Sequence, residues 1–177
     1  MEIAGTSIAF WIPSYVSDRL RLGVNLSNTI FSVISMIKFV CPFLCLVILR
    51  LFNDNMMRLM RVLFLAAALG HLLMNFAASP VLNIILFTAA QFFSACVSAL
   101  IWSVYIPSLA DTGKVSAANG MLDFAGYFGA SAANVMIPSV MGKIGWNGVV
   151  YMWSAFMLLG FAVTVYRGIN DKKQNAV

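Results

Sequence analysis

Long apolar runs separated by short polar segments dominate the pattern of hydrophobic and polar positions along the chain. Six runs stand out, at residues 3–16, 26–49, 59–77, 81–106, 115–141 and 148–166. About 20 apolar residues cross the hydrocarbon core of a bilayer as an α-helix, so these runs predict six transmembrane helices, the first of them short. The pattern therefore predicts an all-α, polytopic membrane protein whose single domain, residues 1–177, is a six-helix bundle.

The segments between the runs are polar or turn-forming. Pro80 follows Ala78 and Ser79 at one of them, and proline suits the first turn of the next helix. Such short links cannot hold domains of their own, so we expect consecutive helices to be antiparallel neighbours. The last run contains few polar residues, and we expect it to face lipid.

The composition excludes a soluble domain. Of all residues, 62% are hydrophobic and 10% are charged, whereas soluble domains have about 45–50% apolar and about 25% charged residues. The net charge of +5 comes from basic residues scattered between apolar runs, which does not indicate a nucleic-acid surface. The three cysteines, Cys41, Cys45 and Cys96, lie inside apolar runs without metal-ligand spacing, and we expect them to be buried as small hydrophobic side chains.

The basic residues divide unequally between the two sides of the predicted bundle. Six crossings place both ends of the chain on one side, together with Arg50, Arg58, Arg61, Lys114, Arg167, Lys172 and Lys173. The other side has Arg19, Arg21 and Lys143. Because cytoplasmic loops are enriched in Lys and Arg, this distribution predicts a plasma (inner) membrane protein with both termini in the cytoplasm.

The first run is barely long enough to cross a bilayer and begins at the start of the chain. We therefore expect that this helix naturally begins upstream and that an N-terminal part of a longer protein is missing.

Lys38 is a charged residue near the centre of the second run. It continues a polar stripe formed by Asn28, Ser32 and Ser35 at helical spacings of three and four. A lysine at the bilayer centre is costly and typically faces a protein interior or a wet cavity. This position favours a functional cation, and the alternative is a structural ion pair.

The fourth and fifth runs carry further polar positions. Gln91, Ser94 and Ser98 lie on one face of the fourth run, which indicates either a helix that lines a polar pathway or hydrogen bonds between helices. On the fifth run, Asn119, Asp123 and Asn134 share a face. Asp123 either has a role there, for example by pairing with Lys38 where the two helices approach, or lies close enough to the interface to be hydrated.

No catalytic or cofactor motif is present. The chain has no nucleophile elbow, metalloprotease motif, Walker loop or nucleotide fingerprint, which predicts neither an enzyme nor a cofactor. His71 lies four residues before Asn75; a structural or interfacial histidine is favoured over a proton relay. No Glu or Cys is placed to complete a metal site with His71.

Two stretches resemble a known transporter family. One covers residues 5–15 and ends in Trp11-Ile12-Pro13-Ser14-Tyr15; the other covers residues 114–131 and is followed by Gly145-Trp146-Asn147-Gly148. They are similar to the seventh and the eleventh-to-twelfth helices of the major facilitator superfamily, most of all to its organophosphate:phosphate antiporters or the similar organic-anion symporters. The resemblance spans nearly the whole chain but only the C-terminal half of a family member.

The resemblance implies that the six runs are helices seven to twelve of that fold. The first and fourth would line a cavity, with Trp11 and Tyr15 as part of its wall, and the second and fifth would border an N-terminal half. The family's gating loop would lie at residues 51–61. There the Gly-rich, basic motif of the family is reduced to Asp54 and scattered arginines such as Arg58.

These expectations combine into a transport function. We expect alternating-access transport of a small organic solute, an anion such as a sugar phosphate or glycerol phosphate, with phosphate or another ion as the coupling partner. An N-terminal half or a second copy of the chain, within the lipid bilayer, would complete the transporter. The alternative is a non-transporting scaffold or truncated gene product; a third hypothesis is an intramembrane enzyme that uses Lys38, Asp123 or His71.

Overall fold

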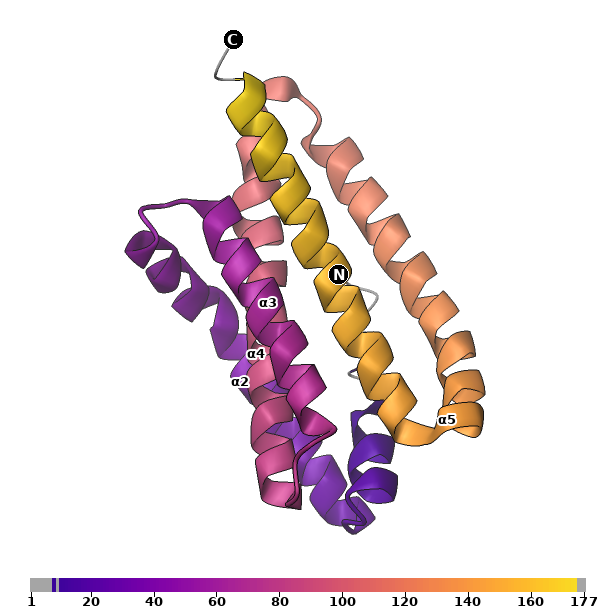
Figure 1. Ribbon diagram of the computed structural model, residues 1–177. Coiled ribbons are helices and arrows are strands. Elements are labelled where there is room, and N and C mark those ends of the chain that lie inside the picture. Colours follow the sequence, from indigo (N-terminus) through magenta and orange to yellow (C-terminus); the bar gives the residue numbers. More distant parts are fainter. Residues whose placement is uncertain (1–7, 9, 175–177) are drawn as a thin grey trace.

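The structure is a computed structural model that describes residue 8 and residues 10–174, with the backbone alone for residues 169–174. Nearly all of these residues are helical (Figure 1). The elements are the π-helix η1 (Tyr15–Arg19), α2 (Val24–Leu51), α3 (Met56–Met74), α4 (Pro80–Leu100), the π-helix η2 (Ile101–Tyr105), the 3-10 helix η3 (Pro107–Thr112) and α5 (Val115–Gln174). The described residues contain no strand, which confirms the all-α prediction for this part of the chain.

Four helical segments are long and apolar enough to cross a membrane. They are Val24–Leu51, Met56–Met74, Pro80–Thr112 and Val115–Gly168. The first three contain or overlap the predicted spans 26–49, 59–77 and 81–106, and the fourth contains both 115–141 and 148–166. These helices indicate a membrane protein. Of the first predicted span, residues 3–7 and 9 lie outside the described residues, and residues 10–14 form a helix that continues into η1.

The last two predicted spans, 115–141 and 148–166, are joined at Gly145 without a loop. Helix α5 folds back on itself there, so that residues 115–144 form a first arm and residues 146–174 a second arm (Figure 1). Gly145 has φ 66° and ψ −167°, a backbone conformation that is essentially restricted to glycine. One glycine thus reverses the chain without a loop, which explains why the predicted link at residues 142–145 is a bend within one element.

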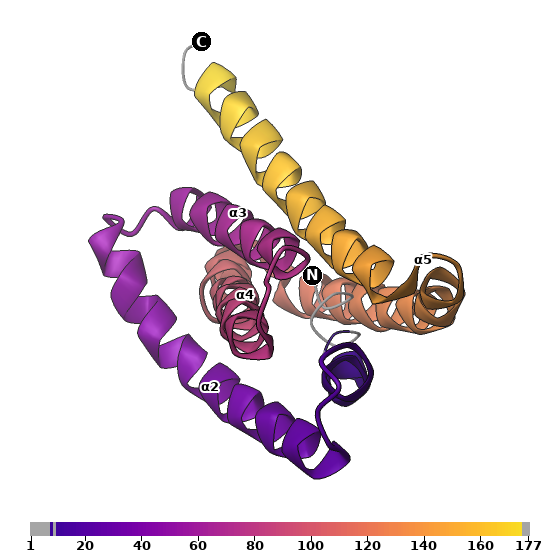
Figure 2. The ribbon, with the colours of Figure 1, turned by 60° about the horizontal axis from the view of Figure 1, so that its bottom comes forward.

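Helix α4 occupies the centre of the bundle, between α2, α3 and α5 (Figure 2). Helix α3 packs against both α4 and α5, whereas α2 packs against α4 and η1. A Cβ atom built on Gly70 of α3 would lie 3.0 Å from the Cβ of Ala90, so α3 and α4 approach closely at this level. The Ser154 hydroxyl on the second arm donates a hydrogen bond to the Ala68 carbonyl of α3 at 3.0 Å.

Local sequence signals explain where α3 and α4 begin. Pro80 is the first residue of α4, and the hydroxyl of the preceding Ser79 accepts a hydrogen bond from the Leu82 backbone N–H at 3.2 Å. The expected place of Pro80 in the first helical turn is confirmed. At the start of α3, the Asn55 side chain accepts a hydrogen bond from the Arg58 N–H at 2.9 Å. Both caps satisfy backbone donors that a helix N-terminus otherwise leaves without a partner.

The cysteines lie at the contact between α2 and α4. Cys41, Cys45 and Cys96 are free thiols and at most 1% exposed. The Cys45 thiol lies 3.2 Å from the Cys96 carbonyl and donates to it. Their expected burial as small hydrophobic side chains is confirmed.

The second arm of α5 differs from a helix that simply faces lipid. One of its faces is buried in the bundle and includes Val149, Val150, Trp153 and Met157. The other face is exposed and includes Leu158 and Leu159. The last run looked lipid-facing because Trp, Val and Met are apolar, but in this chain they form core contacts on one side of the helix.

Candidate functional site

The polar face of α4 lies inside the bundle. Gln91 is 1% exposed and Ser94 is also buried, while Ser98 is half-buried. The Ser94 hydroxyl donates to the Ala90 carbonyl at 2.9 Å and lies 3.7 Å from the Met157 sulfur. Both amide atoms of Gln91 are buried without a hydrogen-bond partner among the described residues. A buried polar group without a partner is costly and rare, so Gln91 stands out as a candidate for binding something other than the chain itself.

Tyr15 connects the N-terminal segment to this face. Its ring is buried, and its hydroxyl donates a hydrogen bond to the Asn83 side-chain oxygen at 2.8 Å. The Asn83 amide in turn donates to the Met74 carbonyl at the end of α3, at 2.9 Å. Tyr15 therefore belongs to a three-element hydrogen-bond chain, and it does not stand as a wall of an open cavity in this conformation.

An aromatic cluster surrounds Tyr15. The ring centroids of Tyr15, His71, Phe87 and Trp153 are separated by 5.6 to 6.3 Å in the contacts Tyr15–Phe87, Tyr15–Trp153, His71–Phe87, His71–Trp153 and Phe87–Trp153. The Nδ1 atom of His71 lies 2.8 Å from the Ala67 carbonyl, which satisfies one side of the ring. The His71 Nε2 and Trp153 Nε1 atoms are buried without a partner among the described residues.

The cluster and Gln91 occupy one level of the bundle. Phe87 lies one helical turn before Gln91 on α4, and His71 directly follows Gly70, which packs on Ala90. This layer of the bundle therefore combines apolar ring surfaces with hydrogen-bonding groups that lack partners, on His71 of α3, Gln91 of α4 and Trp153 of α5. Such a layer is chemically suited to hydrogen-bond a polar group or water, and none of its residues named above is charged.

Trp11 contacts the first arm of α5. Its indole N–H donates to the Asn134 side-chain oxygen at 3.1 Å, and its ring packs edge-on against Trp146 with centroids 6.4 Å apart. Two predicted site residues, 123 positions apart in the chain, are therefore brought together. On the same arm, Asn119 and Asp123 are half-buried.

The polar stripe of α2 lies outside the bundle. Asn28, Ser32 and Ser35 are exposed, and Lys38, near the middle of the 28-residue helix, is half-buried. The hydroxyls of Ser32 and Ser35 donate back to the Asn28 and Phe31 carbonyls of their own helix, at 3.0 and 2.8 Å. Helix α2 contacts α4 and η1 rather than α5, so the structure does not bring Lys38 and Asp123 onto neighbouring helices.

Asp54 and Arg58 lie at one end of the bundle, where the chain turns from α2 into α3. Both are exposed, and Asn53 and Asp54 adopt left-handed backbone conformations with φ of 52° and 55°. The turn is thus a tight connection. Neither residue is near the layer of Tyr15, Asn83 and Trp153, which belongs to the opposite end, where α3 ends and α4 begins.

Sequence reasoning missed Asn83 and Trp153. The signal for Asn83 was present, because positions 83, 87, 91, 94 and 98 repeat at spacings of three and four and extend the α4 stripe toward its start. Trp153 gave no comparable signal, since its burial depends on how the second arm packs against α3. Among the described residues, no group of three or more His, Cys, Asp or Glu side chains is placed to hold a metal ion.

Comparisons of the chain with protein-family models, curated proteins and solved structures give no match. The resemblance to the major facilitator superfamily therefore stays a prediction.

Proposed function

We propose that the chain is one half of a secondary transporter that carries a small organic anion, such as a sugar phosphate or glycerol phosphate, by alternating access. An N-terminal six-helix half or a second copy of the chain completes the transporter. In its described part, the structure has four helical segments long and apolar enough to cross a membrane. The proposal counts the two arms of α5 separately and takes residues 10–14 as the end of the first span.

The exposed polar face of α2 carries the proposal. This helix is apolar enough to cross a membrane, yet Asn28, Ser32 and Ser35 are exposed and Lys38 lies at its centre. Polar groups in the hydrocarbon region are expensive and typically face a protein interior or a wet cavity. Since the chain itself leaves this face uncovered, another half or an aqueous pathway must lie against it.

The arrangement of the helices also supports the proposal. The N-terminal helical segment lies between α2 and α5 (Figure 2). In the family that the sequence resembles, the second and fifth spans border the other half and the first and fourth line the cavity. In this chain the fourth predicted span contains the π-helix η2, and the first predicted span ends within the π-helix η1. Such π-helical turns are frequent at functional sites because they interrupt the regular backbone hydrogen bonds.

The proposed mechanism uses binding and no covalent chemistry. Lys38 supplies the positive charge that attracts the anion. The Gln91 amide lacks a partner in the described residues, and it donates hydrogen bonds to the anion when the two halves of the transporter rotate apart and open the cavity. Trp11, Tyr15, Ser94 and Ser98 shape the wall. Asn119, Asp123 and Asn134 on the first arm, with Asp54 and Arg58 in the α2–α3 turn, contribute the helix contacts and the gate.

The orientation of the chain is part of the proposal. The end of α2, the start of α3 and the start of α5 provide Arg50, Arg58 and Lys114, whereas Arg19, Arg21 and Lys143 lie near the opposite end, toward Gly145. This asymmetry supports a plasma (inner) membrane location with both termini in the cytoplasm.

Transport by reconstituted protein tests the proposal. The full chain is placed in phosphate-loaded proteoliposomes at a density at which chemical cross-linking detects pairs, and uptake of labelled glycerol phosphate is measured. We expect uptake above that of protein-free vesicles and a reduction of about ten-fold in Lys38→Gln, because a charge-assisted contact to the anion is lost. The matched control, Lys143→Gln, removes an exposed lysine next to the bend and leaves uptake unchanged.

Two results would contradict the proposal. One is the absence of uptake by paired wild-type chains, which would favour the alternative of a non-transporting scaffold. The other is uptake that Lys38→Gln leaves at the wild-type rate.

A further inference from the structure

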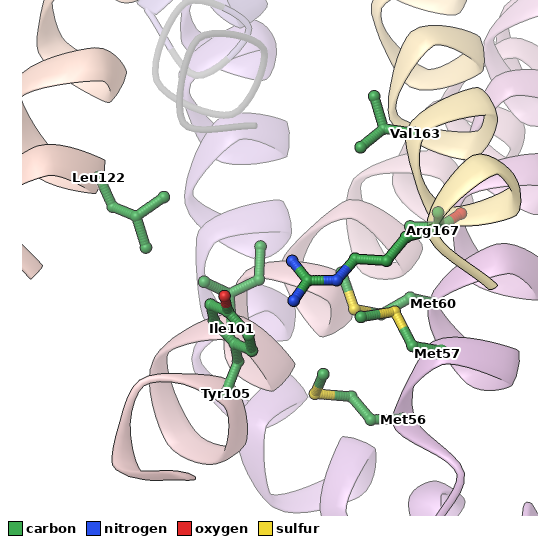
Figure 3. A pocket seen from close by; sticks show the side chains of 9 residues that line it. Met56, Met57, Met60, Ile101, Tyr105, Leu122, Val163 and Arg167 are labelled. Carbon is green, nitrogen blue, oxygen red and sulfur yellow. The ribbon is translucent and has the colours of Figure 1, made fainter. Parts of the chain in front are cut away.

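A cavity lies toward the opposite end of the bundle from the aromatic cluster around Tyr15. It has a volume of about 170 Å³ and is partly open. It lies between α3, η2 and the two arms of α5 (Figure 3), and its lining residues are Met56, Met57, Met60, Ile101, Tyr105, Leu122, Val163, Thr164 and Arg167. Six of these nine are aliphatic or Met side chains, so the cavity favours an apolar occupant.

Arg167 gives this apolar cavity a single charge. Its side chain extends from the second arm across the cavity toward Ile101 and Tyr105 (Figure 3). None of the nine lining residues is acidic. Among the described lining residues, the Tyr105 and Thr164 hydroxyls are the other polar groups, and the Thr164 hydroxyl already donates to the Phe161 carbonyl at 2.7 Å. Among the described residues, the lining therefore offers Arg167 no acidic side chain.

A second guanidinium lies next to Arg167. A Cβ atom added to Gly168 would collide with a terminal nitrogen of Arg61, which places the Arg61 guanidinium beside this part of the second arm. The Arg61 Nε atom is buried without a hydrogen-bond partner among the described residues. Arg61 does not line the cavity, but its charge adds to that of Arg167 at this end of the bundle and favours an anion there.

The cavity lies where an amphiphile in the bilayer would present its head group. Met56 begins α3, Tyr105 ends η2 and Arg167 lies close to the end of α5, so the lining comes from one end of the bundle. Arg and Tyr are typical of membrane–water interfaces, where one part of a side chain contacts lipid tails and the other contacts head groups.

We propose that this cavity binds a single-chain anionic amphiphile, a long-chain carboxylate, with its tail among Met56, Met57 and Met60 and its carboxylate on Arg167. The volume suffices for a group about as large as benzene, hence for part of an acyl chain, with the remainder leaving through the open side. Methionine side chains are flexible and adapt to irregular apolar ligands. The planar guanidinium matches a carboxylate through two parallel hydrogen bonds.

This site is independent of the proposed transport pathway. The lining contains none of Lys38, Gln91, Ser94 or Ser98. A sugar phosphate is also a poor occupant, because most of its hydroxyls would be buried against methionine and leucine side chains without hydrogen-bond partners.

Photolabelling of the purified full chain tests the proposal directly. A palmitate analogue with a diazirine in its tail is irradiated with the protein in neutral detergent, and the modified peptides are identified by mass spectrometry. We expect adducts within residues 56–60 or 163–167, and competition by unlabelled palmitate but not by hexadecanol or a hexadecyl ammonium. Adducts confined to the exposed face of α2, or equal competition by hexadecanol, would overturn the proposal.

Binding measurements with two pairs of variants test separately whether palmitate binding depends on the charge of Arg167 and on the free volume of the cavity. Arg167→Gln is expected to weaken palmitate binding about ten-fold by removing the bidentate contact, while Arg50→Gln, an exposed arginine at the same end, leaves binding unchanged. Leu122→Trp fills the cavity and abolishes binding, whereas Leu159→Trp on the exposed face of the second arm does not.

The result that overturns the assignment is equal palmitate affinity in all four variants. Tight binding of phosphatidylglycerol with no binding of palmitate would overturn it as well, because the occupant would then be a two-chain lipid.

Discussion

Helices α2 and α4 are both apolar enough to cross a membrane and both carry a polar stripe, but the bundle places the two stripes in opposite environments. On α4, Asn83, Gln91 and Ser94 are buried, and the contacts of Asn83 and Ser94 reach η1, α3 and the second arm of α5. On α2, Asn28, Ser32 and Ser35 are exposed. Hydropathy alone does not separate these cases, because each helix presents polar side chains at the same helical spacing.

The two environments imply different roles for the two polar stripes. The α4 stripe is held inside a packed layer, where a hydrogen bond such as Tyr15–Asn83 fixes helix positions and the Gln91 amide remains unsatisfied. The α2 stripe contributes little to the packing of this chain and needs water or another protein surface against it. Substitutions on α4 should therefore change stability, and substitutions on α2 should change accessibility and transport.

The largest expected effect comes from the close contact of α4 with α3. Gly70→Leu inserts a side chain where even a Cβ atom would lie 3.0 Å from the Cβ of Ala90. We expect a loss of about 3 kcal/mol in the free energy of unfolding, measured by denaturant titration in mixed micelles, because overpacking forces the helices apart. Gly120→Leu on the first arm, where nothing lies within 4 Å, is the control. Equal losses in both variants would mean that α3 and α4 do not approach at Gly70.

A paired asparagine test compares the two stripes themselves. Asn83→Ala removes the acceptor of the Tyr15 hydroxyl and the donor to the Met74 carbonyl, and should cost about 2 kcal/mol of unfolding free energy. Asn28→Ala on the exposed stripe should change it by less than about 0.5 kcal/mol. Equal costs at both positions, measured in the same titration, would remove the distinction between the stripes.

Replacing Gln91 should change the free energy of unfolding in the opposite direction from the replacement of Asn83. Replacement by leucine removes two buried polar atoms that lack partners, so Gln91→Leu is expected to raise the free energy of unfolding by about 1 kcal/mol. The same variant should lower transport, since the amide is the proposed hydrogen-bond donor to the solute. A destabilised Gln91→Leu protein would show that the amide has a structural partner.

Much of the fold follows from the hydropathy pattern. The predicted span 26–49 lies within Val24–Leu51, and Pro80 begins α4 as its position in a turn indicated. The pattern predicted a break between the runs 115–141 and 148–166, and the chain turns there at Gly145, which divides α5 into two arms. The pattern did not show that the backbone conformation of one glycine would make this turn without a loop.

The candidate site was predictable only in part. The stripe of Gln91 and Ser94 was visible from its spacing, and both residues are buried. The contact between Trp11 and Asn134 joins residues 123 positions apart and depends on which helices are neighbours, which periodicity does not encode. The same reason explains why the place of Trp153 in the aromatic cluster was missed.

Thiol accessibility in intact membranes tests the central claim that the polar face of α2 borders water. Ser35→Cys and Val33→Cys introduce thiols at two exposed positions of similar depth on nearly opposite faces of the same helix, and the native cysteines are buried. A membrane-impermeant thiol reagent should modify Ser35→Cys about ten times faster than Val33→Cys, because the reactive thiolate does not form in hydrocarbon. Equally slow modification at both positions would contradict the account and place the α2 stripe in lipid or in a dry contact.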